Sequence, residues 1–159
     1  MDWKEGIIKD VVIRSAKQYA DKRGWLAEIF RSDEIAQDDM PVMGYVSATK
    51  PGVARGPHEH REQTDIFGFV GPGNLRIRLW DNRKDSSSYG VMQIVDAGEK
   101  NPVVVVVPPG VVHGYRNISS VDAIVLNFPN RLYAGKGKKQ AVDEIRYEEE
   151  KNTSFIMDN

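Results

Sequence analysis

The sequence predicts an all-β domain, either a sandwich or a closed barrel, and three observations support this prediction. Short apolar runs rich in β-branched residues recur along the chain, and turn segments containing Gly or Pro separate them. Few segments show helical periodicity, so little helix is expected. The length of 159 residues is typical of one domain, so residues 1–159 are interpreted as a single domain.

Three strands and one short helical segment are expected in the first part of the chain. Residues 11–13 are β-branched and predict the opening strand. Residues 21–24 read Asp-Lys-Arg-Gly, which is turn chemistry, and strands are expected over 25–30 and 43–49. Residues 32–37 begin with a capping-type serine and could form one or two helical turns.

The middle of the chain predicts a hairpin. Residues 66–70 and 75–80 are apolar strands on either side of Gly71-Pro-Gly-Asn74, a sequence typical of a hairpin turn. A polar loop is expected over 81–90, and a strand over 91–95.

The last third begins with a buried strand. Five consecutive valines, 103–107, predict a strand that is buried on both faces. A further strand is expected over 123–126 and a Gly/Lys-rich loop over 130–139, and residues 141–147 could form a helical turn or a strand. Four aromatic side chains are expected in the core: Trp25, Phe67, Phe69 and Trp80.

Composition excludes several classes of function. The net charge of −1 and the pI near 6.3 argue against a nucleic-acid partner. There is no cysteine, which excludes disulfides, zinc–thiolate sites and thiol nucleophiles. No apolar run has the length of a signal peptide or a membrane span. A cytoplasmic protein without a membrane partner is therefore expected.

All three histidines fall in two turn segments, residues 52–60 and 108–117. His58 and His60 alternate along an extended segment, so their side chains are expected on one face. Asp65 follows, and His113 is expected to approach from a distant strand. Two or three imidazoles and one carboxylate would suit iron, manganese, nickel or zinc. A divalent transition metal held by these four residues is therefore one alternative.

The spacing of these residues resembles a known superfamily. Gly-x5-His-x-His-x4-Asp, beginning at Gly52, and Pro-x-Gly-x2-His-x3-Asn, beginning at Pro108, resemble the two sequence motifs of the cupins. An aspartate, Asp65, stands where the first motif usually has glutamate. The resemblance implies a cupin jelly-roll β-barrel.

Four ordered blocks carry a narrower resemblance. They are Asp21-Lys-Arg-Gly24 with Glu28 and Phe30, residues 52–58, residues 80–90 and residues 107–115. Together they are similar to the dTDP-4-dehydrorhamnose 3,5-epimerase family. The resemblance implies an isomerase of deoxysugar biosynthesis that acts on a 4-keto-6-deoxy nucleotide sugar. It also implies a cupin that works without a metal and forms a homodimer.

The resemblance assigns roles to several residues. His58 corresponds to the base that removes a proton next to the ketone. His113 would line the pocket and hold the ketone or enolate oxygen. Arg55 would clamp the diphosphate. Arg23 and Glu28 correspond to nucleotide contacts, in part across the dimer.

The sequence departs from the family at other pocket positions. His60 and Asp65 stand where the family has a glutamine-like residue and a lysine, so both become candidate substrate contacts. By spacing, the family's tyrosine acid falls at Leu126; Asn127 lies beside it, and Tyr133 is the nearest downstream tyrosine. Asn127 and Tyr133 are therefore a candidate contact and a candidate acid.

A carboxylate in the family's C-terminal segment orients the base, and Glu149 or Asp143 could stand there. Two other functions remain open, the metal-dependent cupin and a non-catalytic nucleotide-sugar binder. Within the epimerase interpretation, single-centre epimerisation or ketoisomerisation needs fewer groups than full 3,5-epimerisation.

Overall fold

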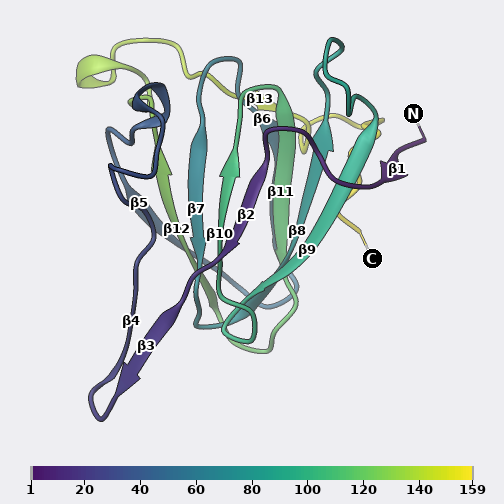
Figure 1. The fold of residues 1–159 in the computed structure, drawn as a ribbon. Helices are drawn as coiled ribbons and strands as arrows, with labels where there is room; N and C mark the ends of the chain where they lie inside the picture. The colour runs from purple at the N-terminus through teal and green to yellow at the C-terminus, as the bar shows by residue number, and fades with distance from the viewer. Residues whose placement is uncertain (1, 159) are drawn as a thin grey trace.

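The computed structural model describes residues 2–158 and consists almost entirely of β-strands, which confirms the predicted class (Figure 1). In chain order the strands are β1 (Lys4–Glu5), β2 (Val12–Ser15), β3 (Gln18–Asp21), β4 (Gly24–Ala27), β5 (Tyr45–Thr49), β6 (Ala54–Glu59), β7 (Asp65–Phe69), β8 (Asn74–Asp81), β9 (Val91–Gly98), β10 (Val103–Val107), β11 (Val111–Asn117), β12 (Ala123–Pro129) and β13 (Ile145–Arg146). Two single-turn 3₁₀ helices, Gln37–Asp39 and Lys136–Lys138, are the helical segments of the described residues.

The strands form two sheets and a separate hairpin. One sheet has the order β1-β9-β8-β11-β6-β13 and the other the order β2-β10-β7-β12-β5, while β3 and β4 pair only with each other. The main core lies between the two sheets and contains Phe67, Phe69, Ile77 and Val105. In Figure 1 the β3–β4 hairpin projects away from the body of the domain.

The run of five valines forms β10 near the middle of the five-stranded sheet. Val103, Val105 and Val107 face the main core, and Val104 belongs to a second cluster on the outer face of the sheet. The prediction of a strand with two buried faces is confirmed, although Val106 is only partly buried.

The predicted hairpin over 66–80 is wrong. β7 pairs with β10 and β12, whereas β8 pairs with β9 and β11 in the other sheet. The Gly71–Asn74 segment therefore carries the chain from one sheet to the other. Gly71 and Gly73 both have positive φ, and a Cβ on Gly73 would lie 2.6 Å from the Cα atom of Ala123. Turn residues predict a reversal, but they do not determine which strands pair after it.

The expected helical turns over 32–37 are absent: residues 32–34 form a turn, and the 3₁₀ helix begins only at Gln37. So short a segment has too few hydrogen bonds to form a helix without packing support. The strand expected over 25–30 ends at Ala27. Trp25 lies in the projecting hairpin and is 50% exposed, so its predicted core position is wrong, whereas Phe67, Phe69 and Trp80 are buried.

The C-terminal segment is brought to the same sheet as the first histidine turn. β13 pairs with β6, with Ile145 opposite Glu59 and Arg146 opposite His58. The 141–147 segment therefore contains a short strand, one of the two predicted alternatives. Within residues 2–158 no helix is long and apolar enough to cross a membrane.

Candidate active site

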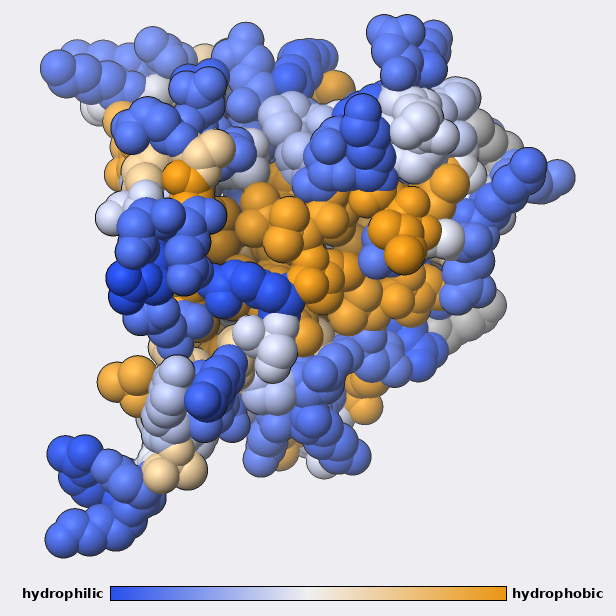
Figure 2. All heavy atoms as spheres, viewed as in Figure 1, coloured by the Kyte–Doolittle hydropathy of each residue, from blue (hydrophilic) through white to orange (hydrophobic). Residues whose placement is uncertain are grey.

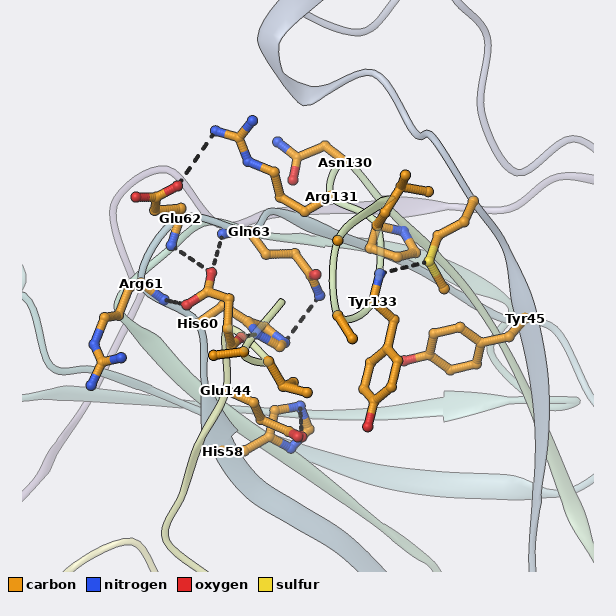
Figure 3. Close-up of a pocket in the computed structure, with 18 of the residues that line it drawn as sticks. Tyr45, His58, His60, Arg61, Glu62, Gln63, Asn130, Arg131, Tyr133 and Glu144 are labelled. Atoms are coloured by element: carbon orange, nitrogen blue, oxygen red, sulfur yellow. Dashed lines mark hydrogen bonds and ion pairs between the residues drawn. The ribbon is translucent and has the colours of Figure 1, made fainter. Parts of the chain in front are cut away.

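A pocket of about 1350 Å³ opens between β5, β6 and the 129–148 segment. Figure 3 shows His58 and His60 on one side of it, with Tyr133 and Tyr45 on the other in this view. Pocket-lining side chains therefore come from parts of the chain far apart in sequence, and the barrel brings them together.

The three histidines converge as the sequence predicted. His58 lies opposite His113 in the β6–β11 pairing, and their ring centroids are 4.4 Å apart. The His60 ring lies 5.4 Å from that of His58 and 5.9 Å from that of His113. Glu59, between the first two, points to the opposite face, where it accepts a hydrogen bond from the Tyr147 hydroxyl.

Asp65 is the buried centre of this cluster. Its Oδ2 atom lies 3.2 Å from His60 Nε2 and 3.5 Å from His113 Nε2. Its Oδ1 atom accepts hydrogen bonds from the amide groups of Gln63 and Asn127, each at 3.0 Å. Burial would raise the pKa of Asp65, but the adjacent imidazoles of His113 and His60 outweigh it and lower the pKa.

Hydrogen bonds fix the orientation of both buried imidazoles. His60 Nδ1 contacts the backbone carbonyl of Asp143, and His113 Nδ1 lies 3.0 Å from the carbonyl of Val111. Because a carbonyl oxygen only accepts, each Nδ1 carries the hydrogen and each Nε2 faces Asp65. Burial would lower the pKa of His60, yet the neighbouring carboxylates of Asp65 and Asp143 raise it.

His58 occupies the pocket side of the cluster. Its Nε2 atom lies 3.9 Å from Glu144 Oε1, and both side chains are largely buried. Burial, followed by the neighbouring His113 and His60, lowers the pKa of His58 to about 2. The imidazole is therefore neutral at physiological pH, and it has a carboxylate at its edge.

The carboxylate beside His58 differs from both residues that the sequence suggested. Glu144 is the one in contact, while Glu149 lies 3.8 Å from Arg146 at the surface. The Asp143 side chain instead accepts hydrogen bonds from the backbone N–H groups of residues 61, 62 and 63. Glu144 reaches His58 because β13 pairs with β6. A strand of only two residues has no sequence pattern from which this pairing could be predicted.

His113 lies behind His58 and His60. It is 3% exposed and is not one of the residues that line the pocket. The His113 ring contacts Phe67 and His58, which both line the pocket, so His113 lies beneath the pocket floor that these two side chains form. The pocket-lining position implied by the resemblance is therefore taken by His58 and His60.

Arg55 lies on the wall of the pocket. Its Nε donates to the Thr49 hydroxyl at 2.9 Å, and a terminal nitrogen donates to the carbonyl of Ala48 at 2.8 Å. These bonds to the end of β5 hold the guanidinium at the pocket wall.

The residues around the predicted tyrosine position lie on two faces of β12. Leu126 packs in the outer cluster, facing away from the pocket, whereas Asn127 points inward to Asp65 and donates to the Tyr45 hydroxyl at 2.7 Å. The residue at the position that spacing assigns to the family's tyrosine therefore faces away from the pocket. Tyr133 lines the pocket and is half exposed.

Arg23 and Glu28 are far from this group within their own chain. Arg23 pairs with Asp21 at the tip of the β3–β4 hairpin, and Glu28 lies 3.5 Å from Arg31. Neither residue lines the pocket.

Comparison with known proteins identifies the family. The sequence model of dTDP-4-dehydrorhamnose 3,5-epimerase matches residues 5–148. The chain belongs to the dTDP-4-dehydrorhamnose 3,5-epimerase family. Membership confirms the family and the class of enzyme predicted from the four sequence blocks, that of nucleotide-sugar epimerases.

Individual relatives agree with this family. The chain is 38% identical to "Probable low-salt glycan biosynthesis epimerase Agl13" of Haloferax volcanii over 127 residues, 79% of this chain and 81% of that protein. It is 31% identical to the spore coat polysaccharide biosynthesis protein SpsL of Bacillus subtilis, over 80% of this chain and 83% of that protein. The crystal structure of dTDP-4-dehydrorhamnose 3,5-epimerase from Sulfolobus tokodaii superposes with a TM-score of 0.67 at 29% identity, covering 81% and 75% of the two chains.

Proposed function

We propose that this epimerase-family protein removes a proton next to the ketone of a 4-keto-6-deoxy nucleotide sugar and returns it to epimerise or isomerise the sugar. The ketone acidifies its neighbouring C–H bonds, so a positioned base can form an enolate. The observation that carries the proposal is a neutral His58 in the pocket with the Glu144 carboxylate at its edge.

His58 is the proposed base. Its Nε2 faces the pocket side of the cluster, where a substrate C–H group can approach, and Glu144 stabilises the imidazolium that forms on proton transfer. A base positioned in this way typically contributes a rate increase of about 10²–10⁴-fold. His113 acts through His58, as a positioning residue beneath the ring.

The diphosphate of the substrate is assigned to Arg55. A planar guanidinium can donate two hydrogen bonds to phosphate oxygens, and Thr49 and Ala48 hold this one in place. His60 is a further pocket contact. Asp65 and Asn127, beneath it, act by fixing the orientation of His60.

Tyr133 is the proposed acid that protonates the enolate. In the view of Figure 3 its ring lies across the pocket from His58, so the two groups can act on opposite faces of a sugar placed between them. Proton removal on one face and return on the other inverts the carbon centre.

We further propose that the protein functions as a homodimer. Figure 2 shows an apolar surface in the middle of the viewed face, over β2 and β10 and toward β9. Val12 and Val46, on the two edge strands of the five-stranded sheet, are both exposed. Arg23 and Glu28 can contact a nucleotide only if the β3–β4 hairpin reaches the pocket of a second copy. The cytoplasmic location remains a prediction.

The reaction is tested with a panel of 4-keto-6-deoxy nucleotide sugars incubated with the protein in D₂O. We expect solvent deuterium to enter a carbon next to the ketone of at least one sugar, detected by NMR and mass spectrometry. Tight binding of a sugar with neither turnover nor exchange would contradict the proposal, and it would identify a non-catalytic binder instead.

A further inference from the structure

We propose that His60, Asp65 and His113 form a binding site for a divalent first-row transition-metal ion beneath the floor of the pocket, beside His58. This inference goes beyond the proposed reaction, whose steps need no metal. The sequence left open a metal site formed by the histidines and Asp65, and this inference assigns that site to three of the residues. It rests on the arrangement of their side chains.

The first observation is which atoms face one another. The Nδ1 atoms of His60 and His113 donate to the backbone carbonyls of Asp143 and Val111, so each Nε2 carries a lone pair when the ring is neutral. Both lone pairs point toward the carboxylate of Asp65. Three electron-rich atoms facing one another repel unless a cation lies between them.

The second observation is burial without compensation. Asp65 is 1% exposed and His113 is 3% exposed. Asp65 Oδ2 and His113 Nε2 are buried atoms without a hydrogen-bond partner among the described residues. Leaving buried polar atoms unsatisfied costs about 1–3 kcal/mol each, so such atoms indicate an unseen partner.

The distances fit a shared ion. Donor atoms that are each about 2.1 Å from one metal lie about 3.0 Å apart at an octahedral angle and about 3.4 Å apart at a tetrahedral one. Asp65 Oδ2 lies 3.2 Å from His60 Nε2 and 3.5 Å from His113 Nε2. The other distances among the candidate ligand atoms, with one from His58, are at most 4.8 Å, so a small shift of the side chains brings them within the roughly 4.2 Å that two bonds to one ion can span.

Hydrogen bonds orient the three side chains in the way that is usual for metal ligands. Metal-binding imidazoles usually donate their second N–H to a carbonyl or carboxylate, which is what His60 and His113 do. Asp65 Oδ1 is held by Asn127 and Gln63, which leaves Oδ2 for the ion. The Gln63 amide also lies 3.1 Å from His60 Nε2, so binding would displace that one contact.

A proton on His60 is the competing explanation. It would place an imidazolium beside Asp65 Oδ2, but it would leave the lone pair of His113 Nε2 facing the same carboxylate. A metal ion satisfies all three atoms at once.

Two imidazole nitrogens and one carboxylate oxygen are ligands suited to iron, manganese, cobalt, nickel and zinc. His58 also offers a ligand atom within this group, but the proposed set leaves it out, because its Nε2 lies 3.9 Å from Glu144 and the ring serves as the base. A bound ion would supply a Lewis acid close to the proposed base.

The test measures metal content directly, in the absence of any sugar. Untagged protein is stripped with a chelator, incubated separately with Mn²⁺, Fe²⁺, Co²⁺, Ni²⁺ or Zn²⁺, desalted and analysed by elemental mass spectrometry. We expect one ion per chain for at least one metal, with a visible absorption spectrum for the Co²⁺ form that indicates nitrogen and oxygen ligands. A wild-type protein without bound ion under all five conditions would overturn the proposal.

Variants then assign the ligands. Asp65→Asn and His60→Gln are expected to lose the ion, whereas Glu144→Gln and His58→Gln keep it. Loss of the ion in His58→Gln, with retention in Asp65→Asn, would overturn the three-residue assignment. Far-UV circular dichroism checks that each variant is folded. If a variant is not folded, the Co²⁺ spectrum of the wild type and a metal-dependent rise in its Tm still decide the question.

Discussion

Two tyrosine hydroxyls lie on the side of the pocket opposite His58 in the view of Figure 3, and their environments differ. The Tyr45 hydroxyl accepts a hydrogen bond from Asn127, and burial raises its pKa to about 12. Tyr133 is 52% exposed and Tyr45 is 49% exposed, so the hydrogen bond with Asn127, and not exposure, distinguishes the two hydroxyls. Tyr45 is therefore part of the network that holds Asp65, and Tyr133 is the freer candidate for proton donation.

Replacing Tyr133 with Phe is expected to slow epimerisation by about 10²–10⁴-fold, because the enolate then lacks its acid. Deuterium uptake through His58 should persist, since the base is untouched. Tyr45→Phe serves as the matched control and should retain more activity. NMR analysis of the products in D₂O checks both variants, and a larger loss in Tyr45→Phe would reverse the assignment.

Arg55→Ala is expected to raise KM for the nucleotide sugar by about 10- to 100-fold, the size of a lost hydrogen bond to a charged group. Arg55→Lys should recover only part of this loss, because an ammonium cannot donate two parallel hydrogen bonds. Steady-state kinetics give the comparison. Arg76→Ala is the control, because Arg76 pairs with Asp96 away from the pocket. An unchanged KM in Arg55→Ala would exclude Arg55 as the clamp.

Much of the site could be predicted from individual residues. The alternation of His58 and His60 fixes their common face, and the second motif places His113 in a neighbouring strand. Glu144 could not be predicted, because its position depends on long-range pairing between β13 and β6. Leu126, the position that spacing assigns to the family's tyrosine, faces away from the pocket, and its neighbour Asn127 faces inward because successive strand residues point to opposite faces.

At the scale of secondary-structure elements, the C-terminal segment is fastened over the first histidine turn. The Asp143 carboxylate accepts hydrogen bonds from the N–H groups of residues 61, 62 and 63, and the pKa of Asp143 is lowered because these bonds outweigh the opposing effect of burial. The same segment carries Glu144 and the carbonyl that orients His60. The hydrogen bonds of Asp143 therefore also fix the positions of Glu144 and His60 in the candidate active site.

Asp143→Ala is expected to destabilise the fold by about 1–3 kcal/mol, since the N–H groups lose a charged acceptor. The activity should fall as well, because Glu144 and His60 lose their alignment. Urea unfolding gives the free energy of unfolding, and Glu149→Ala, a change at an exposed carboxylate, should leave it nearly unchanged. Equal stability of the two variants would show that the segment does not depend on Asp143.

The sequence predicted the element type better than the pairing. Five valines correctly predicted a strand buried on both faces, because a continuous apolar run places apolar side chains on both faces of a strand. The hairpin predicted at Gly71–Asn74 was wrong, because the two strands that flank this turn belong to different sheets. β3 was missed because Gln18–Asp21 has no apolar alternation, and it pairs only within the projecting hairpin.

On the scale of the whole molecule, the exposed edges of the outer face of the five-stranded sheet are the main candidate for an interface between two copies, because residues 27–35 of the same chain pack on the middle of that face. Register places Val12 beside Val106, and Val46 beside Leu126, on this face. Apolar surface exposed in this way is typical of a face that another protein covers.

Val46→Glu is expected to convert the dimer to a monomer, because Val46 is 62% exposed and a charge there would be buried in the interface. Light scattering coupled to size-exclusion chromatography measures the mass. Ile7→Glu is the control, because Ile7 is exposed near the edge of the other sheet. A monomeric wild type at working concentration would contradict the proposed dimer.

The most direct test of the central claim is the rate of deuterium uptake at the carbons next to the ketone, measured in D₂O by NMR. For the wild type, we predict exchange at one or both of these carbons. Glu144→Gln should exchange more slowly, and His58→Gln should lose exchange to background while still binding the sugar. Exchange at the wild-type rate in His58→Gln would show that another group is the base.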